Sequence, residues 1–571
     1  MSLRPDLSVG IPEETMRVAK AAFPRGCMLM ILRDDLGPIF HDQQFASLFP
    51  ALGQPAATPW RLALITLLQF AEGLSDRQAA GAVRSRIDWK YLLALSLTDA
   101  GFDHTVLCEF RARLIAGRAE AILFDAVLDI AKSRHLVRPD GRQRTDSTRV
   151  VAAVRGLNRM AGITEAMRHA LEVLAVAAPD WLRVQAAPHW VERYQRPTLA
   201  TRLPRNETAR QNHAREIGGD GHRLLAAIFA ADAPTWLRAI PAVETLRLMW
   251  VQQFMLLDGE MHWRTAADGI PPAVLFVSTP HDVDAHYARK NLASWVGYKV
   301  HLTETCDADA PPIITHVRTT TAPVADDQAT EPVHEALEQQ GILPSQHFVD
   351  TGYLSAGILV ETRQRFGVDL IGPVRRDMRW QAQAGKGFTA DAFQINWDER
   401  RVTCPRGAYS SSWTAATDNG ATSVFKIKFS RKDCGACSDR VDCAGAHANR
   451  RSMTLRMQDQ HEALKDGRQR QQTAEFARLY ACRAGIEATI SYAVRAFGMR
   501  HARYIGQAKA HLQHLATAAA MNLMRLARSP KTPSHGQGAA GYPVRRAARQ
   551  DGICQHEGGE EQGMSGYDQR M

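Results

Sequence analysis

The chain has 571 residues, with 70 Lys and Arg against 60 Asp and Glu, which gives a formal net charge of +10. A hydrophobic content of 45% and a charged content of 23% are ordinary for a soluble globular protein, and the length allows roughly two to four domains. No apolar run reaches the roughly 18–20 residues that cross a bilayer, and no apolar export signal opens the sequence, so we expect a cytoplasmic protein without membrane contact.

The first part of the chain is predicted to be helical. We expect a leader over residues 1–44 and an all-α domain over residues 45–138, because apolar residues recur at helical spacing. Gly73 and Leu74 interrupt this pattern, and Ser75 suits the N-cap of a helix over Asp76–Arg84. The pair of helices is compatible with a DNA-binding helix-turn-helix, and equally with a helical bundle that packs on the rest of the protein.

Asp146 is the first carboxylate in an unusual setting. It lies in RQRTDSTRVVAAV (Arg142–Val154), whose β-branched residues predict a strand. A charged side chain on a strand is costly to bury unless it is paired or binds a metal. The alternative is that Asp146 caps a turn with Ser147 and Thr148, and this pattern alone favours the cap.

Strands and helices then alternate along the chain. A helical insert is predicted over residues 157–267, and the alternation after it is typical of an α/β layer architecture. The predicted elements are, in order, strands at Trp295–Thr305 and Pro312–Ala322, a helix at Gln328–Gln340, a short strand in QHFVD and a helix from Ser355.

Asp350 ends the short strand QHFVD. Gly352 permits a sharp turn after it, and Ser355 suits the N-cap of the next helix. Carboxylates at the carboxyl ends of strands in open α/β sheets commonly face a ligand crevice, which makes Asp350 a candidate site residue. A turn-forming Asp with no further role explains the same pattern equally well.

Four cysteines fall in a segment rich in strand and turn residues, which we predict as a β-rich insert over residues 373–470. Four thiolates are a suitable tetrahedral set for Zn²⁺, and His447 could replace one of them. The spacing is not that of a standard zinc finger, and free thiols in a reducing cell are the alternative. We expect a structural zinc ion without a catalytic role, held by Cys404, Cys434, Cys437 and Cys443.

Glu487 is the third candidate carboxylate. A helix is predicted over Gln471–Phe497, and spacings of three and four residues put Tyr480, Arg483 and Glu487 on one face of it. Arg483 can then hold the carboxylate or contact a phosphate. The alternative is an exposed i,i+4 ion pair. Gly485 argues against it, because a glycine inside a helix costs about 1 kcal/mol and suits a close approach.

A basic stretch without any Asp or Glu follows Glu487, from Ala488 to Gln550. It carries the whole excess of positive charge, because the rest of the chain has equal numbers of acidic and basic residues. Such a surface predicts a polyanionic partner, and nucleic acid is the obvious one, although a solvated charge is the alternative for any single residue. The candidate DNA contacts are Arg495, Arg500, Arg503 and Lys509.

The end of the chain is predicted to be a disordered basic tail over residues 529–571, because Pro, Gly, Ser and Gln are frequent there. Arg545, Arg546 and Arg549 lie in this tail and are expected to contact DNA without sequence specificity.

Three carboxylates on separate elements suit the metal-assisted cleavage of a phosphodiester. Mg²⁺ takes oxygen ligands, often a few carboxylates together with water and substrate phosphate. Two such ions can activate the attacking oxygen and stabilise the leaving one. This chemistry gives Asp146, Asp350 and Glu487 a common purpose.

The order of the motifs resembles that of bacterial insertion-sequence transposases of the DDE type. The motifs are TDST with Asp146, VGYKVHLTET, VDTGY with Asp350 and the Y-x-x-R-x-x-x-E that ends at Glu487. The resemblance covers about Phe45 to Arg528. It implies an α/β protein with a ribonuclease-H-like catalytic domain over residues 141–528. This domain contains both inserts and follows an all-α domain similar to that of InsH-type transposases.

The resemblance also implies a role for each site residue. Asp146, Asp350 and Glu487 would bind Mg²⁺ or Mn²⁺, while Tyr480 and Arg483 would support the site and the DNA.

One position departs from the family pattern. The family has a Lys seven residues after the Glu, where this chain has Val494 followed by Arg495. A shift of one residue turns a helical side chain by about 100°, so the sequence leaves open whether Arg495 replaces the Lys.

The function that the resemblance implies is DNA transposition. The protein would bind the terminal inverted repeats of its own element, cleave there with an activated water, and use the freed 3′-hydroxyl to attack double-stranded target DNA. Joining two ends implies a homo-oligomer on DNA. Two alternatives stay open, namely a DNA-binding protein derived from a transposase and a metal-dependent nuclease without strand transfer.

Overall fold

The computed structural model describes the chain up to Arg528, with gaps at Met1, residues 4–9, Arg155, residues 198–203, Arg205, Lys386 and residues 419–421. The tail predicted over residues 529–571, with Arg545, Arg546 and Arg549, lies outside the described residues. None of the described helices is long and apolar enough to span a membrane.

The N-terminal part is helical and includes two helices within the residues predicted as a leader. The helices are α1 (Glu13–Ala22), α2 (Met28–Leu36), α3 (Pro59–Ala71), α4 (Asp76–Ser85), α5 (Ile87–Leu92), α6 (Thr105–Ala116) and α7 (Ile122–Ser133), with a 3₁₀ turn, η1 (Asp42–Leu48), before α3.

The N-cap predicted at Ser75, before α4, is confirmed. Ser75 Oγ accepts a hydrogen bond from Gln78 N at 3.3 Å, and the Gln78 side chain accepts one from Ser75 N at 2.8 Å.

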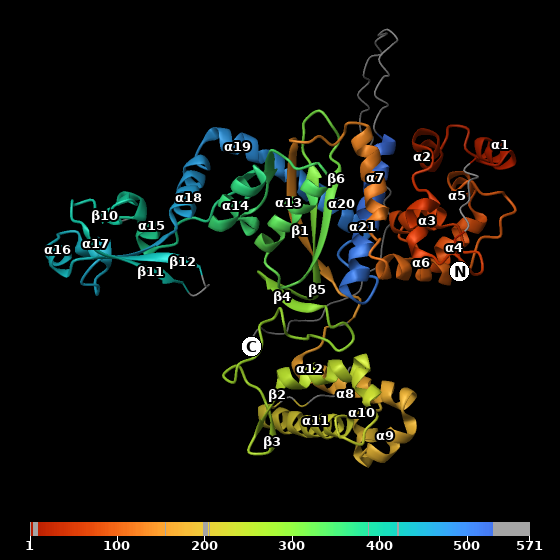
Figure 1. The fold of residues 1–571 in the computed structure, drawn as a ribbon, viewed down its shortest axis with the longest axis horizontal. Helices are drawn as coiled ribbons and strands as arrows, with labels where there is room; N and C mark the ends of the chain where they lie inside the picture. The colour runs from red at the N-terminus through yellow and green to blue at the C-terminus, as the bar shows by residue number, and fades with distance from the viewer. Residues whose placement is uncertain are drawn as a thin grey trace, which may run out of the picture. The chain divides into compact units, whose positions relative to one another are not determined.

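Six described strands form one mixed sheet (Figure 1). They are β1 (Arg142–Val151), β4 (His286–Lys290), β5 (Ala293–Thr305), β6 (Ile314–Thr321), β7 (Gln346–Phe348) and β8 (Asp369–Ile371). The strand order is β4-β5-β1-β7-β8, with β6 also paired to β5. β1 is antiparallel to β5 and parallel to β7, and β7 is parallel to β8. The strands predicted around Asp146, in VGYKVHLTET and in QHFVD are confirmed.

Helices cover the sheet and join it to the N-terminal part. α13 (Thr330–Gln339) contacts β6, and α14 (Ala356–Phe366) contacts β8. α20 (Ala484–Phe497) packs on β1, and α21 (Gln507–Arg528) packs on β6. α21 also contacts α3 and α7, which lie beside it in Figure 1. The N-terminal helices and the sheet therefore share one hydrophobic core, which includes Trp60, Phe110, Leu302, Ile490 and Leu515.

The helical insert between β1 and β4 has a hydrophobic core of its own. Its helices are α8 (Arg159–Ala177), α9 (Pro179–Gln185), α10 (Pro188–Tyr194), α11 (Glu207–Ile228) and α12 (Pro241–Gln253), followed by the hairpin of β2 (Phe254–Leu257) and β3 (Glu260–Trp263). The packing is tight at Gly221, where a Cβ would lie 2.1 Å from the indole of Trp250. The helices predicted in this part of the chain are confirmed.

The β-rich insert after β8 also has a small core, around Phe393, Ile427 and Phe429. β9 and β10 pair with each other, and β11, β12 and β13 form a three-stranded antiparallel sheet. The elements are α15 (Trp380–Ala384), β9 (Gln394–Asn396), β10 (Arg401–Thr403), β11 (Ser410–Thr417), β12 (Ser423–Phe429), α16 (Arg431–Gly435), α17 (Arg440–Ala444), β13 (Ser452–Arg456) and α18 (Gln458–Arg470).

The helix predicted as continuous over Gln471–Phe497 is interrupted. It consists of α19 (Ala474–Tyr480), a 3₁₀ turn η7 (Ala481–Arg483) and α20. Arg144 of β1 donates from Nη1 to the Cys482 carbonyl at 2.5 Å, which gives this carbonyl a partner outside the helix. The prediction of one unbroken helix was wrong, because the break depends on a contact between residues 338 positions apart.

Candidate active site

One face of β1 contacts the segment from Cys482 to Arg500. Side chains alternate across a strand, so Arg144, Asp146 and Thr148 share a face. Arg144 bonds to the Cys482 carbonyl, and Thr148 Oγ1 accepts a hydrogen bond from Arg500 Nε at 3.0 Å. Asp146, between them, faces the same segment from within the strand. It therefore does not cap a turn at the end of β1.

Arg483 joins two of the predicted metal ligands. Its Nη2 donates to Asp146 Oδ2 at 2.7 Å, and its Nη1 donates to Glu487 Oε1 at 2.9 Å. The side chains of Asp146 and Arg483 are 15% and 14% exposed, whereas that of Glu487 is 64% exposed. A carboxylate from a strand and a carboxylate from a helix thus converge on one cation.

Burial raises the pKa of the Asp146 carboxyl to about 6. The charge of Arg483 and the backbone N–H of Ser147 act in the opposite direction, and the negative charge of Asp350 raises this pKa further. Asp350 is therefore close enough to act on Asp146 electrostatically. A further cation beside Asp146 would favour its ionised form.

Asp350 lies in a tight turn after β7. Its Oδ1 accepts a hydrogen bond from Gly352 N at 2.8 Å, which is the turn geometry expected from the sequence. Tyr480 donates from its hydroxyl to the carbonyl of Val349, the residue before Asp350, at 3.2 Å. Tyr480 also stacks on Phe476, with ring centroids 5.4 Å apart. The Tyr480 side chain thus links α19 to the turn that carries Asp350.

Asp326 is an acidic residue near this turn that the sequence analysis missed. Lys299 Nζ donates to Asp326 Oδ1 at 2.7 Å. A Cβ on Gly352 would lie 2.9 Å from Asp350 Oδ1 and 3.2 Å from Asp326 Oδ2, so both carboxylates border the same turn. Burial opposes the charge of Asp326, but Lys299 holds its pKa below the usual value. The sequence could have indicated Asp326, because the pair Asp326-Asp327 comes shortly after the strand predicted at Pro312–Ala322. Asp350 likewise follows a predicted strand.

The predicted DNA contacts differ in their surroundings. Val494 packs against the hydrophobic core, while Arg495 is exposed and donates from Nε to Ser491 O at 3.4 Å. Lys509 is exposed as well, and Arg500 bonds to Thr148 on β1. Exposure leaves Arg495 and Lys509 accessible to a DNA backbone.

Arg503 contacts the N-terminal helices. Its Nη1 donates to the carbonyl of Leu74 at 3.0 Å, and its Cζ lies 5.1 Å from the centroid of the Phe70 ring. Leu74 belongs to the turn between α3 and α4, the predicted helix-turn-helix. Because α3 is buried along most of its length, the observations favour the bundle alternative for α3, and DNA binding by α4 stays a prediction.

The four predicted zinc ligands all line one cavity of about 310 Å³ in the β-rich insert. Two of the thiols accept backbone hydrogen bonds, Cys404 from Ala408 N at 3.3 Å and Cys434 from Arg451 N at 3.4 Å. His447 is not among the described residues that line this cavity. The fold thus brings together cysteines that are far apart in the sequence, without His447.

Two protein-family models match parts of the chain. The model described as a transposase DDE domain matches residues 403–527, and the model described as a transposase domain (DUF772) matches residues 19–113. Both matches support an insertion-sequence transposase of the DDE type. No curated protein and no solved structure matches the chain.

The two matches differ in how much of the candidate active site they contain. The DDE match contains Tyr480, Arg483 and Glu487, while Asp146 and Asp350 lie outside both matched ranges. The second match contains α3 and the turn at Leu74, which contact Arg503 of the basic stretch.

Transposases of this class generally use divalent metal ions such as Mg²⁺. The donor chemistry of this chain fits such an ion, because Asp146, Asp350 and Glu487 offer oxygen atoms and two of them already share a cation. Among the described residues, however, no three His, Cys, Asp or Glu side chains form a group that could hold a metal ion. The carboxylates and the cysteines would therefore each have to rearrange locally around an ion.

Proposed function

We propose that this protein is a transposase, which cleaves DNA at the ends of an insertion sequence and transfers the freed 3′ ends to target DNA. The observation that supports the proposal most is the convergence of Asp146 and Glu487 on Arg483, in a chain with two transposase matches. Water attacks the phosphorus in the first reaction and a 3′-hydroxyl attacks it in the second, so one set of carboxylates can serve both.

Asp146, Asp350 and Glu487 would hold the divalent ion, Mg²⁺ or Mn²⁺. Such an ion supplies activation of the attacking oxygen and charge stabilisation at the leaving oxygen. Arg483 keeps Asp146 and Glu487 together by balancing their charge. Its planar guanidinium also suits two phosphate oxygens, so Arg483 can pass from the carboxylates to the DNA backbone.

Tyr480 has a different role in the proposal. Its hydroxyl holds the Val349 carbonyl, and its ring stacks on Phe476, so it fixes the peptide that leads into Asp350. Tyr480 is thus proposed to position Asp350 from α19, without contact to the reacting phosphate.

The sheet is proposed to belong to a ribonuclease-H-like fold. In its support, β6, β5, β1, β7 and β8 follow one another across the sheet, with antiparallel β6–β5 and β5–β1 pairs and parallel β1–β7 and β7–β8 pairs. Asp146 lies on the middle strand of this series, and Asp350 follows the strand beside it.

The proposed partner is double-stranded DNA, as terminal inverted repeats and as target. The exposed Arg495 and Lys509 would contact phosphates near the carboxylates. The N-terminal helices are proposed to bind the repeats, and α4 supports this with the exposed side chains of Arg77 and Arg84. Two ends must meet for transposition, so we propose a homo-oligomer on DNA.

A structural zinc ion is proposed for the cysteine cavity. Its support is that four thiols line one cavity and that Cys404 and Cys434 accept backbone N–H bonds, which stabilise a thiolate. Zinc would stabilise the β-rich insert and take no part in cleavage.

Cleavage of a DNA that carries an element end tests the carboxylates. Asp146→Asn, Asp350→Asn and Glu487→Gln each remove a charge with little change of shape, so Mg²⁺-dependent cleavage should fall by at least roughly a hundredfold while DNA binding persists. Glu475→Gln is a matched control, because Glu475 is an exposed acid on α19, and it should cut like the wild type. Normal cutting by all three carboxylate variants would show that the site is assigned wrongly.

The same assay separates the alternative functions. A labelled target DNA reports joining, so cleaved ends that are never joined would favour a nuclease. Binding of end DNA by the intact chain without Mg²⁺-dependent or Mn²⁺-dependent cleavage would favour a DNA-binding protein derived from a transposase.

A further inference from the structure

Glu304 is a carboxylate on β5 that is completely buried in the protein, at 0% exposure. A buried charge is costly unless charged and polar partners surround it. The partners of Glu304 come from β1, α20 and α21, so this one side chain joins three elements to β5.

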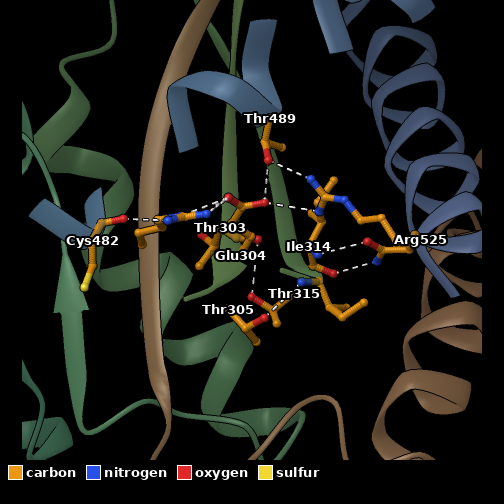
Figure 2. A network of polar contacts seen from close by, with 11 residues as sticks. Thr303, Glu304, Thr305, Ile314, Thr315, Cys482, Thr489 and Arg525 are labelled. Atoms are coloured by element: carbon orange, nitrogen blue, oxygen red, sulfur yellow. Dashed lines mark hydrogen bonds and ion pairs between the residues drawn. The ribbon is translucent and has the colours of Figure 1, made fainter. Parts of the chain in front are cut away.

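Both carboxylate oxygens of Glu304 are hydrogen-bonded (Figure 2). Oε1 accepts from Arg144 Nε at 2.9 Å and from Arg144 Nη2 at 2.7 Å. Oε2 accepts from Thr489 Oγ1 at 2.8 Å and from Arg525 Nη1 at 3.1 Å. Arg525 Nη2 also donates to Thr489 Oγ1 at 2.6 Å. We call Glu304, Arg144, Thr489 and Arg525 the Glu304 cluster.

Arg144 extends the Glu304 cluster to the turn before α20. Its remaining Nη1 donates to the carbonyl of Cys482, which also lies in the network of Figure 2. A Cβ on Gly485 would lie 2.1 Å from Arg144 Nη1 and 2.4 Å from its Cζ, so only glycine lets α20 come this close. The close approach of Arg144 on β1 therefore explains the glycine at the start of α20.

The contacts of the Glu304 cluster lie one or two residues from the candidate active site. The pairs of neighbours along the chain are Arg144 with Asp146, Cys482 with Arg483, and Thr489 with Glu487. A change in the Glu304 cluster would therefore move the Asp146 carboxylate on β1 relative to the Glu487 carboxylate on α20.

We propose that Glu304 is a positioning residue, which fixes α20 against β1 and so sets the separation of Asp146 and Glu487. The inference rests on the proposed function, because it concerns two of the carboxylates assigned there to metal binding. Glu304 acts through Arg144 and Arg525, whose charges it balances inside the protein.

Glu304→Gln tests the positioning role, because it keeps the shape of the side chain and removes the charge that holds two arginines. The Mg²⁺ concentration for half-maximal cleavage should rise by about 10- to 100-fold, which is the usual effect of replacing a residue that holds a metal ligand in place. Mn²⁺ binding, measured by electron paramagnetic resonance without DNA, should weaken by the same factor. Binding of end DNA without metal should be unchanged.

Asn522→Ala is the matched control. Asn522 is also completely buried and links α21 to β6, since it accepts from Ile314 N at 2.9 Å and donates to Ile314 O at 2.8 Å. Loss of the Asn522 side chain should lower Tm. It should leave the metal requirement, which is the Mg²⁺ concentration for half-maximal cleavage, unchanged, because neither bond reaches α20. An equal change of the metal requirement in Asn522→Ala and Glu304→Gln would mean that the Glu304 cluster only stabilises the fold, and the positioning role would fail.

Two milder variants keep the test decisive if Glu304→Gln does not fold. Thr489→Val removes one hydroxyl of the Glu304 cluster, and Gly485→Ala forces a methyl group against Arg144, so both should raise the metal requirement. A wild-type metal requirement in these variants would overturn the positioning role. Normal cleavage by Asp146→Asn would instead overturn the proposed function.

Discussion

Arg503 lies in a stretch without acidic neighbours, yet its contacts are those of a structural residue. Its guanidinium donates to a carbonyl and covers an aromatic ring, so it holds two elements together although the residue is exposed. Arg525 is similar, because its charge is balanced by Glu304 inside the protein. Net charge along a sequence therefore identifies a cationic segment without separating residues that are free to contact DNA from residues that pack within the protein.

Substitution should separate the two kinds of arginine. Arg503→Ala should lower the free energy of unfolding by about 1 kcal/mol, because it removes one hydrogen bond and one cation–π contact, and it should leave the salt dependence of DNA binding unchanged. Arg495→Ala should leave stability unchanged and reduce the slope of log affinity against log salt by about 1. Urea unfolding and DNA titrations at several salt concentrations measure both effects, and the reverse pattern would contradict the distinction.

At the scale of elements, local patterns in the sequence were enough to predict most of the sheet and its helices. The strands around Asp146 and in VGYKVHLTET follow from β-branched residues, and α14 begins where Ser355 accepts a hydrogen bond from Ile358 N at 3.3 Å. The ion pair of Arg483 with Glu487 also followed from helical spacing. These features depend only on residues close together in the chain.

Other features could not be predicted because they depend on distant partners. The 3₁₀ turn before α20 requires Arg144, and the contact of Asp146 with Arg483 joins residues 337 positions apart. Glu304 was part of a recognised motif, but its burial between two arginines follows only from the packing of β5 against α20 and α21. The spacing of apolar and polar residues along the chain does not tell which distant side chain will contact a given residue.

The β-rich insert leads to a prediction about its metal content. Cys434→Ser and Cys437→Ser should each reduce the zinc content of the purified protein from about one ion per chain and lower the Tm of the insert. Mass spectrometry of metals and thermal unfolding measure these changes. Cys108→Ser is the control, because Cys108 is exposed and outside the cavity. A folded wild-type protein that contains no zinc would rule the ion out.

At the scale of the whole molecule, buried histidines link stability to pH. Burial lowers the pKa to about 3 or about 4 for His301, His316, His334, His511 and His514. These rings are neutral in the folded protein. Four of them lie in polar contacts, such as the one of 2.6 Å between the His301 Nδ1 and the Tyr353 hydroxyl; the other three are His334, His511 and His514. In the unfolded chain each ring regains a pKa near 6.5.

Acid should therefore destabilise the folded protein. Below a pH of about 6.5 the unfolded chain binds more protons than the folded protein, so the free energy of unfolding should fall as the pH falls, by roughly 2 kcal/mol for each such histidine at pH 5. Urea unfolding at pH 7 and at pH 5 measures the loss. His514→Gln removes one of these groups and should show a shallower dependence, and equal stability at both pH values would contradict the prediction.

The contact of α21 with α3 and α7 has a consequence for how the protein is made. Ribosomes add roughly 5–20 residues per second, so α3 and α7 leave the ribosome tens of seconds before α21 is complete. During this interval the apolar side chains that α21 will cover lack their final partner. These side chains belong to the core that includes Trp60 and Phe110. A chain whose translation stops before Arg528 cannot complete the core that joins its first helices to the sheet. Such a fragment keeps apolar side chains exposed, which makes it a target for chaperones and proteases.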